Sequence, residues 1–137
     1  MNNKNAHFLH KAMRLLPYIL LIAMVIVLLT NIRLVMTDGD SMQPTYQPGD
    51  ILLCVRSYSP PEVGDVVLIR HNNKLVIKRV AHVAGDVVSN SYLENKIIPE
   101  NHVYVLGDNP DNSHDSRYED FGLVSVEKIW GKVAFCD

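Results

Sequence analysis

The sequence predicts a mainly β protein, in which a single N-terminal transmembrane helix precedes a small coiled β-sheet or barrel-like domain. Three observations carry this prediction. Residues 15–29 form an uncharged apolar run, short aliphatic and β-branched runs recur through the rest of the chain, and turn residues such as Pro48-Gly49-Asp50 separate them. Because no helical pattern lies between the later runs, we expect consecutive strands rather than strands that alternate with helices.

The apolar run predicts a membrane anchor over residues 15–34, behind a cytoplasmic tail over residues 1–14. Fifteen to twenty helical residues, at about 1.5 Å each, cover most of a hydrocarbon layer roughly 30 Å thick. Three cations precede the run and Arg33 follows it, so the positive-inside rule favours a cytoplasmic N-terminus. A cleaved signal peptide is the alternative. The length of the run and the lack of a small-x-small site after it favour an uncleaved anchor.

The remaining segment, residues 35–137, is then an extracytoplasmic domain of about 100 residues, which is enough for one small core. The formal net charge of -2 argues against a nucleic-acid partner. Cys54 and Cys136 can form a disulfide in an oxidising compartment, or Cys54 can simply belong to the core. Strands are expected over residues 51–56, 65–70, 75–80, 86–89, 102–106 and 124–133.

Two adjacent cations, Lys78 and Arg79, interrupt the apolar strand predicted over residues 75–80. Alternate residues of a strand share a face, so one of these cations must point to the apolar side. If it is Lys78, which shares a face with Val76 and Val80, desolvation lowers its pKa and favours the neutral amine. A neutral amine can act as a base, whereas the ordinary alternative is a solvated strand edge.

Ser41 lies on the turn-prone segment 39–45, a few residues beyond the predicted anchor. A serine hydroxyl is a poor nucleophile until a base removes its proton, and a lysine or a histidine can supply that base. The six histidines are weaker candidates. Two precede the anchor and His71 lies in a turn; three remain possible, but no third group is placed to orient them: His82, His102 and His114.

A third segment, residues 107–117, is rich in small hydrogen-bonding side chains. Asp115 and Arg117 can pair with each other, and Ser113 can reach a neighbouring amine. A calcium loop is the alternative, but its spacing fails because Pro110 occupies the third position from Asp108 and no glycine occupies the sixth. We therefore expect no metal and no cofactor.

These three segments, taken in their order along the chain, resemble the type I signal peptidase family, the membrane-bound Ser/Lys peptidases. The matching residues are GDSMQPT followed by PGD, VIKRV followed by AGD, and GDNPDNSHDSR followed by FGLV, and together they cover nearly the whole chain. The resemblance implies a domain of the signal peptidase type and a serine endopeptidase that cleaves signal peptides from exported preproteins at the outer face of the plasma membrane. Its implied partners are preprotein substrates and membrane lipid, with the secretion machinery as a candidate contact and no nucleic acid.

Residue by residue, the resemblance makes Ser41 the acylating nucleophile and Lys78 the general base, which also activates the deacylating water. It makes Ser113 a residue that orients the lysine, beside a supporting Asp115–Arg117 ion pair. The oxyanion and substrate pocket is expected to include four residues, among which Met42 lines the pocket and Pro44 shapes the turn: Gly39, Asp40, Met42 and Pro44. The expected supporting residues are Arg79, Asp108, Ser113, Asp115, Ser116 and Arg117.

The chain departs from the family in two places. Some members place an oxyanion-binding serine hydroxyl two residues before the nucleophile, where this chain has Gly39, so the Ser41 backbone amide is expected to carry more of that role. Only about twenty residues separate Gly85-Asp86 from Gly107-Asp108, where larger members insert a β subdomain. The chain therefore resembles compact members, such as mitochondrial inner-membrane peptidases and the proteases associated with nickel superoxide dismutase. A dedicated maturation protease and an inactive membrane-tethered homologue remain alternatives.

Overall fold

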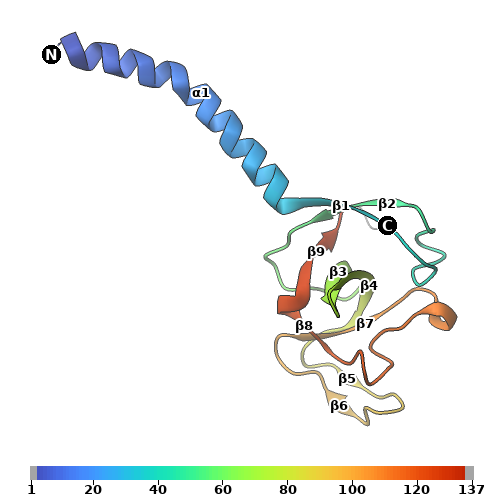
Figure 1. The fold of residues 1–137 in the computed structure, drawn as a ribbon. Coiled ribbons are helices and arrows are strands. Elements are labelled where there is room, and N and C mark those ends of the chain that lie inside the picture. The colour runs from blue at the N-terminus through green and yellow to red at the C-terminus, as the bar shows by residue number, and fades with distance from the viewer. Residues whose placement is uncertain (1–2, 135–137) are drawn as a thin grey trace. The chain divides into compact units, whose positions relative to one another are not determined.

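The computed structural model describes residues 3–134 and separates the chain into two units at Ile32/Arg33. The first unit is the helix α1 (Asn3–Asn31), shown in blue in Figure 1. Within it, Met13–Asn31 is long and apolar enough to cross a membrane. Near its end, the Thr30 hydroxyl donates to the Ile26 carbonyl at 2.8 Å, so its polar group is satisfied within the helix.

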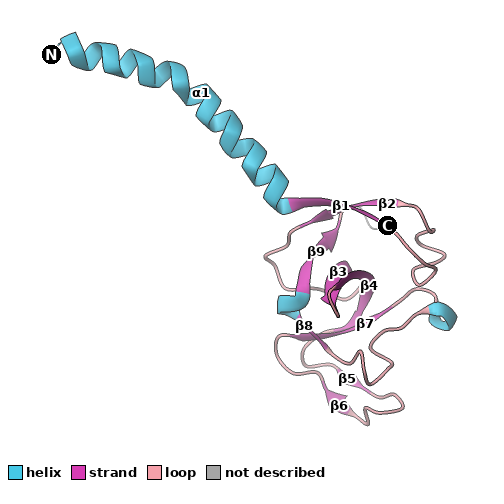
Figure 2. Ribbon diagram, viewed as in Figure 1, coloured by secondary structure: helices cyan, strands magenta, loops and turns pink. Residues whose placement is uncertain are grey.

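The second unit is built on a seven-stranded sheet with the order β1-β2-β9-β3-β4-β7-β8. Its strands are magenta in Figure 2. The pairings β2·β9, β9·β3, β3·β4, β4·β7 and β7·β8 are antiparallel, and β5 pairs with β6 in a separate small hairpin. Two short 3-10 helices, η1 (Pro110–Asn112) and η2 (Val126–Lys128), lie in the connections. The strands are β1 (Ile32–Met36), β2 (Ile51–Val55), β3 (Val66–His71), β4 (Lys74–His82), β5 (Val87–Val88), β6 (Lys96–Ile97), β7 (His102–Leu106), β8 (Val124–Ser125) and β9 (Ile129–Val133).

This architecture confirms the predicted fold class, a mainly β protein with one apolar N-terminal helix. Four details differ from the expected elements. The helix begins at Asn3, within the segment predicted as a tail. It ends at Asn31, and residues 32–34 of the predicted anchor belong to β1, which pairs with β2. The single strand expected over residues 124–133 is divided by η2 into β8 and β9, which occupy separate positions in the sheet. The two-residue strand β6 was not predicted.

Strand β3 contributes to the core on both of its faces. Its residues contribute alternately to two buried clusters, with Val67 and Ile69 in one and Val66 and Leu68 in the other. A strand buried on both faces reads as a continuous apolar run rather than an alternating one. The second cluster also contains Cys54, which is fully buried. Cys136 lies outside the described residues, so their pairing stays a prediction.

Candidate active site

Ser41 lies on the loop after β1. Thr37, the first residue of this loop, forms backbone hydrogen bonds with residues at the other end of the loop. The Thr37 backbone N–H donates to the Asp50 carbonyl at 2.9 Å, and Gly49 N–H donates to the Thr37 carbonyl at 2.9 Å. Inside the loop, Tyr46 N–H donates to the Met42 carbonyl at 2.9 Å. The Met42 side chain is only 4% exposed and packs in a core cluster, so the residue beside Ser41 fastens the bend to the domain.

Lys78 lies in the middle of β4, opposite Val67 of β3, and is only 4% exposed. Burial lowers its pKa from the ordinary value of 10.5, because removal from water disfavours the charged ammonium. The Arg117 guanidinium lowers this pKa further, whereas the carboxylates of Asp115 and Asp108 oppose the shift. Of the two adjacent cations, the structure thus places Lys78 on the buried side, with the pKa direction that a base requires.

Ser41 and Lys78 line the same pocket, which has a volume of about 140 Å³. It lies between β1 with the loop after it and the first half of β4. Within the described part of the chain, no hydrogen bond joins Ser41 Oγ to Lys78 Nζ. The complete lining is Val35, Met36, Thr37, Asp38, Gly39, Ser41, Met42, Leu75, Val76, Ile77 and Lys78.

Asp108 connects the strand that carries Lys78 to the loop that carries Ser41. Its carboxylate accepts hydrogen bonds from Arg79 Nε at 2.9 Å and Arg79 Nη2 at 2.7 Å. It also accepts one from Thr45 Oγ1 at 2.5 Å. Burial alone would raise the pKa of Asp108, but the hydrogen bonds from Arg79 and Thr45 outweigh it and hold the pKa below its usual value. This charged bridge fixes the position of the Ser41 loop relative to β4.

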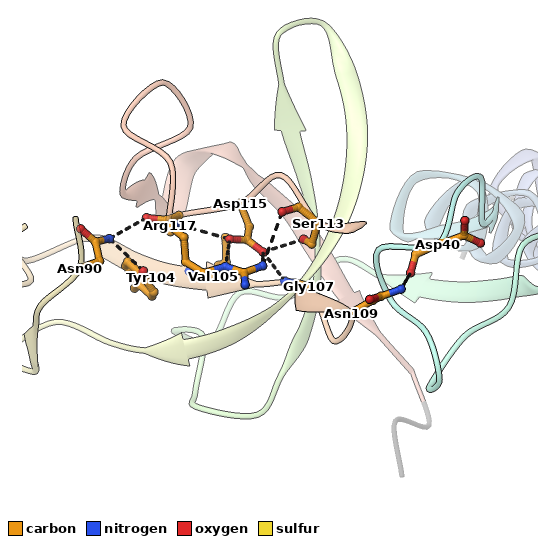
Figure 3. Close-up of polar contacts among 10 residues, drawn as sticks. Asp40, Asn90, Tyr104, Val105, Gly107, Asn109, Ser113, Asp115 and Arg117 are labelled. Atoms are coloured by element: carbon orange, nitrogen blue, oxygen red, sulfur yellow. Dashed lines mark hydrogen bonds and ion pairs between the residues drawn. The ribbon is translucent and has the colours of Figure 1, made fainter. Parts of the chain in front are cut away.

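Asn109 adds two hydrogen bonds to the same loop. Its backbone N–H donates to the Ser41 carbonyl at 3.0 Å. Its side-chain Nδ2 donates to the Asp40 carbonyl at 3.0 Å, a hydrogen bond that Figure 3 shows. The preceding residue is glycine for a steric reason. A Cβ at Gly107 would collide with Ser113 Oγ and with the Ser41 carbonyl oxygen. The close approach of these two segments therefore depends on the absence of a side chain at Gly107.

Asp115 is fully buried and organises the loop after β7. Its carboxylate accepts hydrogen bonds from Gly107 N–H at 2.9 Å and from Ser113 Oγ at 2.6 Å. Arg117 donates to it through Nε and Nη2, each at 2.8 Å (Figure 3). Burial alone would raise the pKa of Asp115, but these hydrogen bonds lower it to about 2. The expected Asp115–Arg117 pair is therefore present, and the Ser113 hydroxyl donates to Asp115 rather than to Lys78.

Ser116 fastens this loop to the sheet. Its hydroxyl donates to the Gly122 carbonyl at 2.7 Å and accepts from Val105 N–H of β7 at 3.1 Å. Its carbonyl accepts hydrogen bonds from Tyr92 Oη at 2.9 Å and Asn90 Nδ2 at 3.3 Å, which tie the loop to the segment between β5 and β6. Ser116 thus acts on the packing of the loop, away from the pocket.

The predicted site residues fall into two groups. The pocket shared by Ser41 and Lys78 is also lined by Gly39 and Met42. Asp40 and Pro44 lie on the same loop but outside that lining, and the Asp40 carboxylate accepts from Gln43 Nε2 at 2.9 Å. The surrounding residues form the bridges already described: Arg79, Asp108, Ser113, Asp115, Ser116 and Arg117.

Sequence reasoning missed the bridging roles of Thr45 and Asn109. Both residues lie inside the segments that were singled out, and their polar side chains were the available signal. Neither contact could be assigned from the sequence, because the Thr45–Asp108 hydrogen bond joins residues 63 positions apart. Among the side chains that the structure describes, no group of three or more His, Cys, Asp or Glu residues is placed to hold a metal ion.

A coiled antiparallel domain behind an apolar helix, with a serine and a buried lysine on one pocket, has the architecture of a membrane-tethered peptidase of the signal peptidase type. The chain belongs to the signal peptidase, peptidase S26 family, whose sequence profile matches residues 9–93 and 89–136.

Its curated relatives include two mitochondrial proteins and one from a cyanobacterium. Mitochondrial ATP-independent inner membrane protease subunit 1b of Arabidopsis thaliana is 40% identical over 109 residues, which cover 69% of this chain and 63% of that protein. Mitochondrial inner membrane protease subunit 1 of Xenopus tropicalis is 33% identical, over 74% of this chain and 66% of that protein. Probable signal peptidase I-1 of Synechocystis is 28% identical, over 71% and 66%. The chain thus spans a little under two thirds of the length of these relatives.

Proposed function

We propose that this chain is a membrane-anchored serine endopeptidase in which Ser41 is the nucleophile and Lys78 the general base. The observation that carries the proposal is the burial of Lys78, with its lowered pKa, on the pocket that Ser41 also lines. A lysine with its ordinary pKa is protonated at neutral pH and cannot accept a proton, whereas a desolvated one can. The alternative of a solvated strand-edge lysine does not fit a side chain that is 4% exposed.

In the proposed reaction, the neutral Lys78 amine takes the proton from Ser41 Oγ as this oxygen attacks the scissile carbonyl carbon. The tetrahedral oxyanion is stabilised by the Ser41 backbone N–H, beside Gly39. Lys78 then returns the proton to the leaving amine, which departs and leaves an acyl ester on Ser41. In the second half, Lys78 takes a proton from water, the hydroxide attacks the ester, and Ser41 regains its proton.

The strands beside the pocket suit a substrate peptide in an extended conformation. Residues 74–78 of β4 pair with β3 on one side, whereas β7 pairs with β4 only from Arg79 onward. Strand β1 is at the end of the sheet order. A substrate peptide in an extended conformation, placed between β1 and the first half of β4, would present its backbone hydrogen-bonding groups to both strands. The pocket between them has a volume of about 140 Å³, which one side chain of the substrate can fill.

We further propose that the substrates are N-terminal signal peptides of exported preproteins and that cleavage occurs at the outer face of the plasma membrane. The cation distribution around α1 supports a cytoplasmic N-terminus. A dedicated maturation protease with few substrates is the second candidate, because several relatives are named as mitochondrial inner membrane protease subunits. Those names also make the mitochondrial inner membrane the alternative location. A contact with the secretion machinery remains part of the proposal.

The dyad is tested by cleavage of a preprotein in detergent, comparing wild type with Ser41→Ala and Lys78→Met. The methionine fills the space of the buried lysine stem and removes only the amine. Both variants should lose turnover while retaining the far-UV circular dichroism of the wild type, and Lys74→Met, an exposed lysine on the same strand, is the matched control. Unchanged turnover in either dyad variant would refute the proposed roles of Ser41 and Lys78. A wild-type chain that leaves the preprotein uncleaved would contradict a general signal peptidase and favour the dedicated protease or the inactive homologue.

The substrate range needs a separate experiment. N-terminal peptides of the exported proteome are compared between cells with the wild-type chain and cells with the Ser41→Ala variant. A general signal peptidase leaves many preproteins uncleaved when it is inactive, whereas a dedicated protease leaves one or a few. Fractionation of the same cells reports whether the chain resides in the plasma membrane.

A further inference from the structure

A second cavity, of about 550 Å³, lies away from Ser41 and Lys78 where the end regions of β2 and β3 meet the start of β9. Three cationic side chains line it, Arg56, Arg70 and Lys128, against the single carboxylate of Glu127. None of the three cations forms an ion pair with any carboxylate that the structure describes. This concentration of positive charge is notable in a chain whose formal net charge is -2.

Aromatic residues complete this cavity. Trp130 and Tyr58 both line it, and each ring is covered by an arginine. The Arg33 guanidinium lies 4.6 Å from the Trp130 ring centroid, and that of Arg56 lies 5.8 Å from the Tyr58 ring centroid. Tryptophan, tyrosine and arginine together are typical of the headgroup layer of a membrane, where amphipathic side chains meet both water and lipid.

The path of the chain ties this cavity to the membrane. Arg33 follows the last residue of the candidate span, Asn31, by only two positions. Two extended residues cover at most about 7 Å. Since Arg33 packs on Trp130, one wall of the cavity lies one arginine side chain away from a residue that follows the candidate span by two positions. Exposed apolar side chains of β1, Leu34 and Met36, lie on the same stretch of chain.

We propose that this cavity binds the phosphate-bearing headgroup of an anionic phospholipid. Arg56, Arg70 and Lys128 supply the positive charge, and a volume of about 550 Å³ is within the range of small-molecule sites. The phosphodiester accepts hydrogen bonds from the two guanidinium groups, which suit phosphate geometry better than an ammonium does. Free phosphate offers the same chemistry, but the proximity of Arg33 to the span favours a lipid. The site is independent of the proposed peptidase activity.

Trp130 is the sole tryptophan of the chain and reports on this wall. The full-length protein is placed in phosphatidylcholine nanodiscs that contain a small fraction of brominated phosphatidylglycerol or, in parallel, brominated phosphatidylcholine. Bromine quenches tryptophan fluorescence at short range. The brominated phosphatidylglycerol should quench Trp130 more strongly at the same mole fraction. In Arg56→Gln/Lys128→Gln, the fraction needed for half-maximal quenching should rise about fivefold for each cation removed.

The matched control is Lys74→Gln/Lys96→Gln, which removes two exposed cations outside the cavity and should retain the wild-type preference. Equal quenching by the two brominated lipids would overturn the proposal, as would a preference that survives in the cavity variant. Inorganic phosphate is added to unlabelled phosphatidylcholine discs in a separate arm. A Trp130 response there without a preference for phosphatidylglycerol would refute the lipid and identify a free anion instead. Each readout is fluorescence, so loss of peptidase activity would not affect the result.

Discussion

Replacement of Asp115 by asparagine tests how the buried loop after β7 supports Lys78. The wild-type carboxylate accepts hydrogen bonds from Gly107, Ser113 and Arg117 and is fully buried. Asparagine keeps nearly the same shape but removes the charge and turns one acceptor into a donor. The Arg117 guanidinium, whose side chain is 32% exposed, then loses its carboxylate partner.

The pKa of Asp115 gives the expected loss of stability. A fall from 3.8 to about 2 corresponds to roughly 2 kcal/mol of folding free energy that is present above pH 3.8 and is lost as the pH falls through about 2. Removing one partner of a buried pair typically costs about 3–5 kcal/mol, and the partial exposure of Arg117 places this site near the lower end. We therefore expect Asp115→Asn to destabilise the domain by about 2–3 kcal/mol at pH 7, with a smaller difference near pH 2.

The same substitution should also lower the pKa of Lys78. Asp115 raises the pKa of Lys78 and Arg117 lowers it, so without the carboxylate the pKa falls further. The ascending limb of the pH–rate profile should therefore move to lower pH, even as the maximal rate drops. Denaturant unfolding and preprotein cleavage from pH 5 to 10 measure the two effects. The control is Asp111→Asn, an exposed carboxylate of η1. An alkaline shift of the limb, or wild-type stability at pH 7, would refute the reasoning.

Three further predictions concern the same site. In the wild type, cleavage should rise with pH through a midpoint below 10.5, because burial lowers the pKa of Lys78; a flat rate from pH 6 to 9, with chemistry limiting, would contradict a titrating lysine. Gly107→Ala should abolish most activity, because its Cβ collides with Ser113 Oγ and the Ser41 carbonyl; wild-type turnover with an unchanged circular dichroism spectrum would count against this close packing. Asp108→Asn should lower kcat more than it raises KM, because it loosens the bridge between the Ser41 loop and β4; rescue by Asp108→Glu is the check, and a change in KM alone would argue for a substrate contact instead.

The fold was largely predictable because its signals are local. An uncharged run of apolar residues indicates a membrane span, a signal peptide or a buried core element, and short aliphatic runs between turn residues favour strands. The first and last residues of the helix and strands were harder to predict from the sequence. Residues 32–34 were predicted as part of the anchor, and Ile32 and Leu34 suit a membrane helix and a strand equally well. Pairing with β2, which depends on residues 51–55, decided in favour of the strand.

The site was predictable only in part. The alternation of residues 75–80 required one of Lys78 and Arg79 to face apolar neighbours, but no local pattern identified which one. The packing of β4 against β3 buries Lys78, whereas Arg79 on the opposite face reaches Asp108, 29 positions further along the chain. A hydrogen bond over that separation depends on how the strands of the sheet are arranged, and the periodicity of the sequence does not determine that arrangement.

By itself, the sequence determined that this protein has an apolar N-terminal helix, a β-rich domain and three segments that resemble those of the signal peptidase family, because each of these signals lies in consecutive residues. Only the tertiary structure decided that Lys78 is the buried cation, that it shares a pocket with Ser41, and that Asp108 and Asn109 hold the two segments in place. It also gathered Arg56, Arg70 and Lys128 around one cavity. The physical reason is that desolvation and ion pairing depend on distances between strands, which are set only when the strands pair and pack into the sheet.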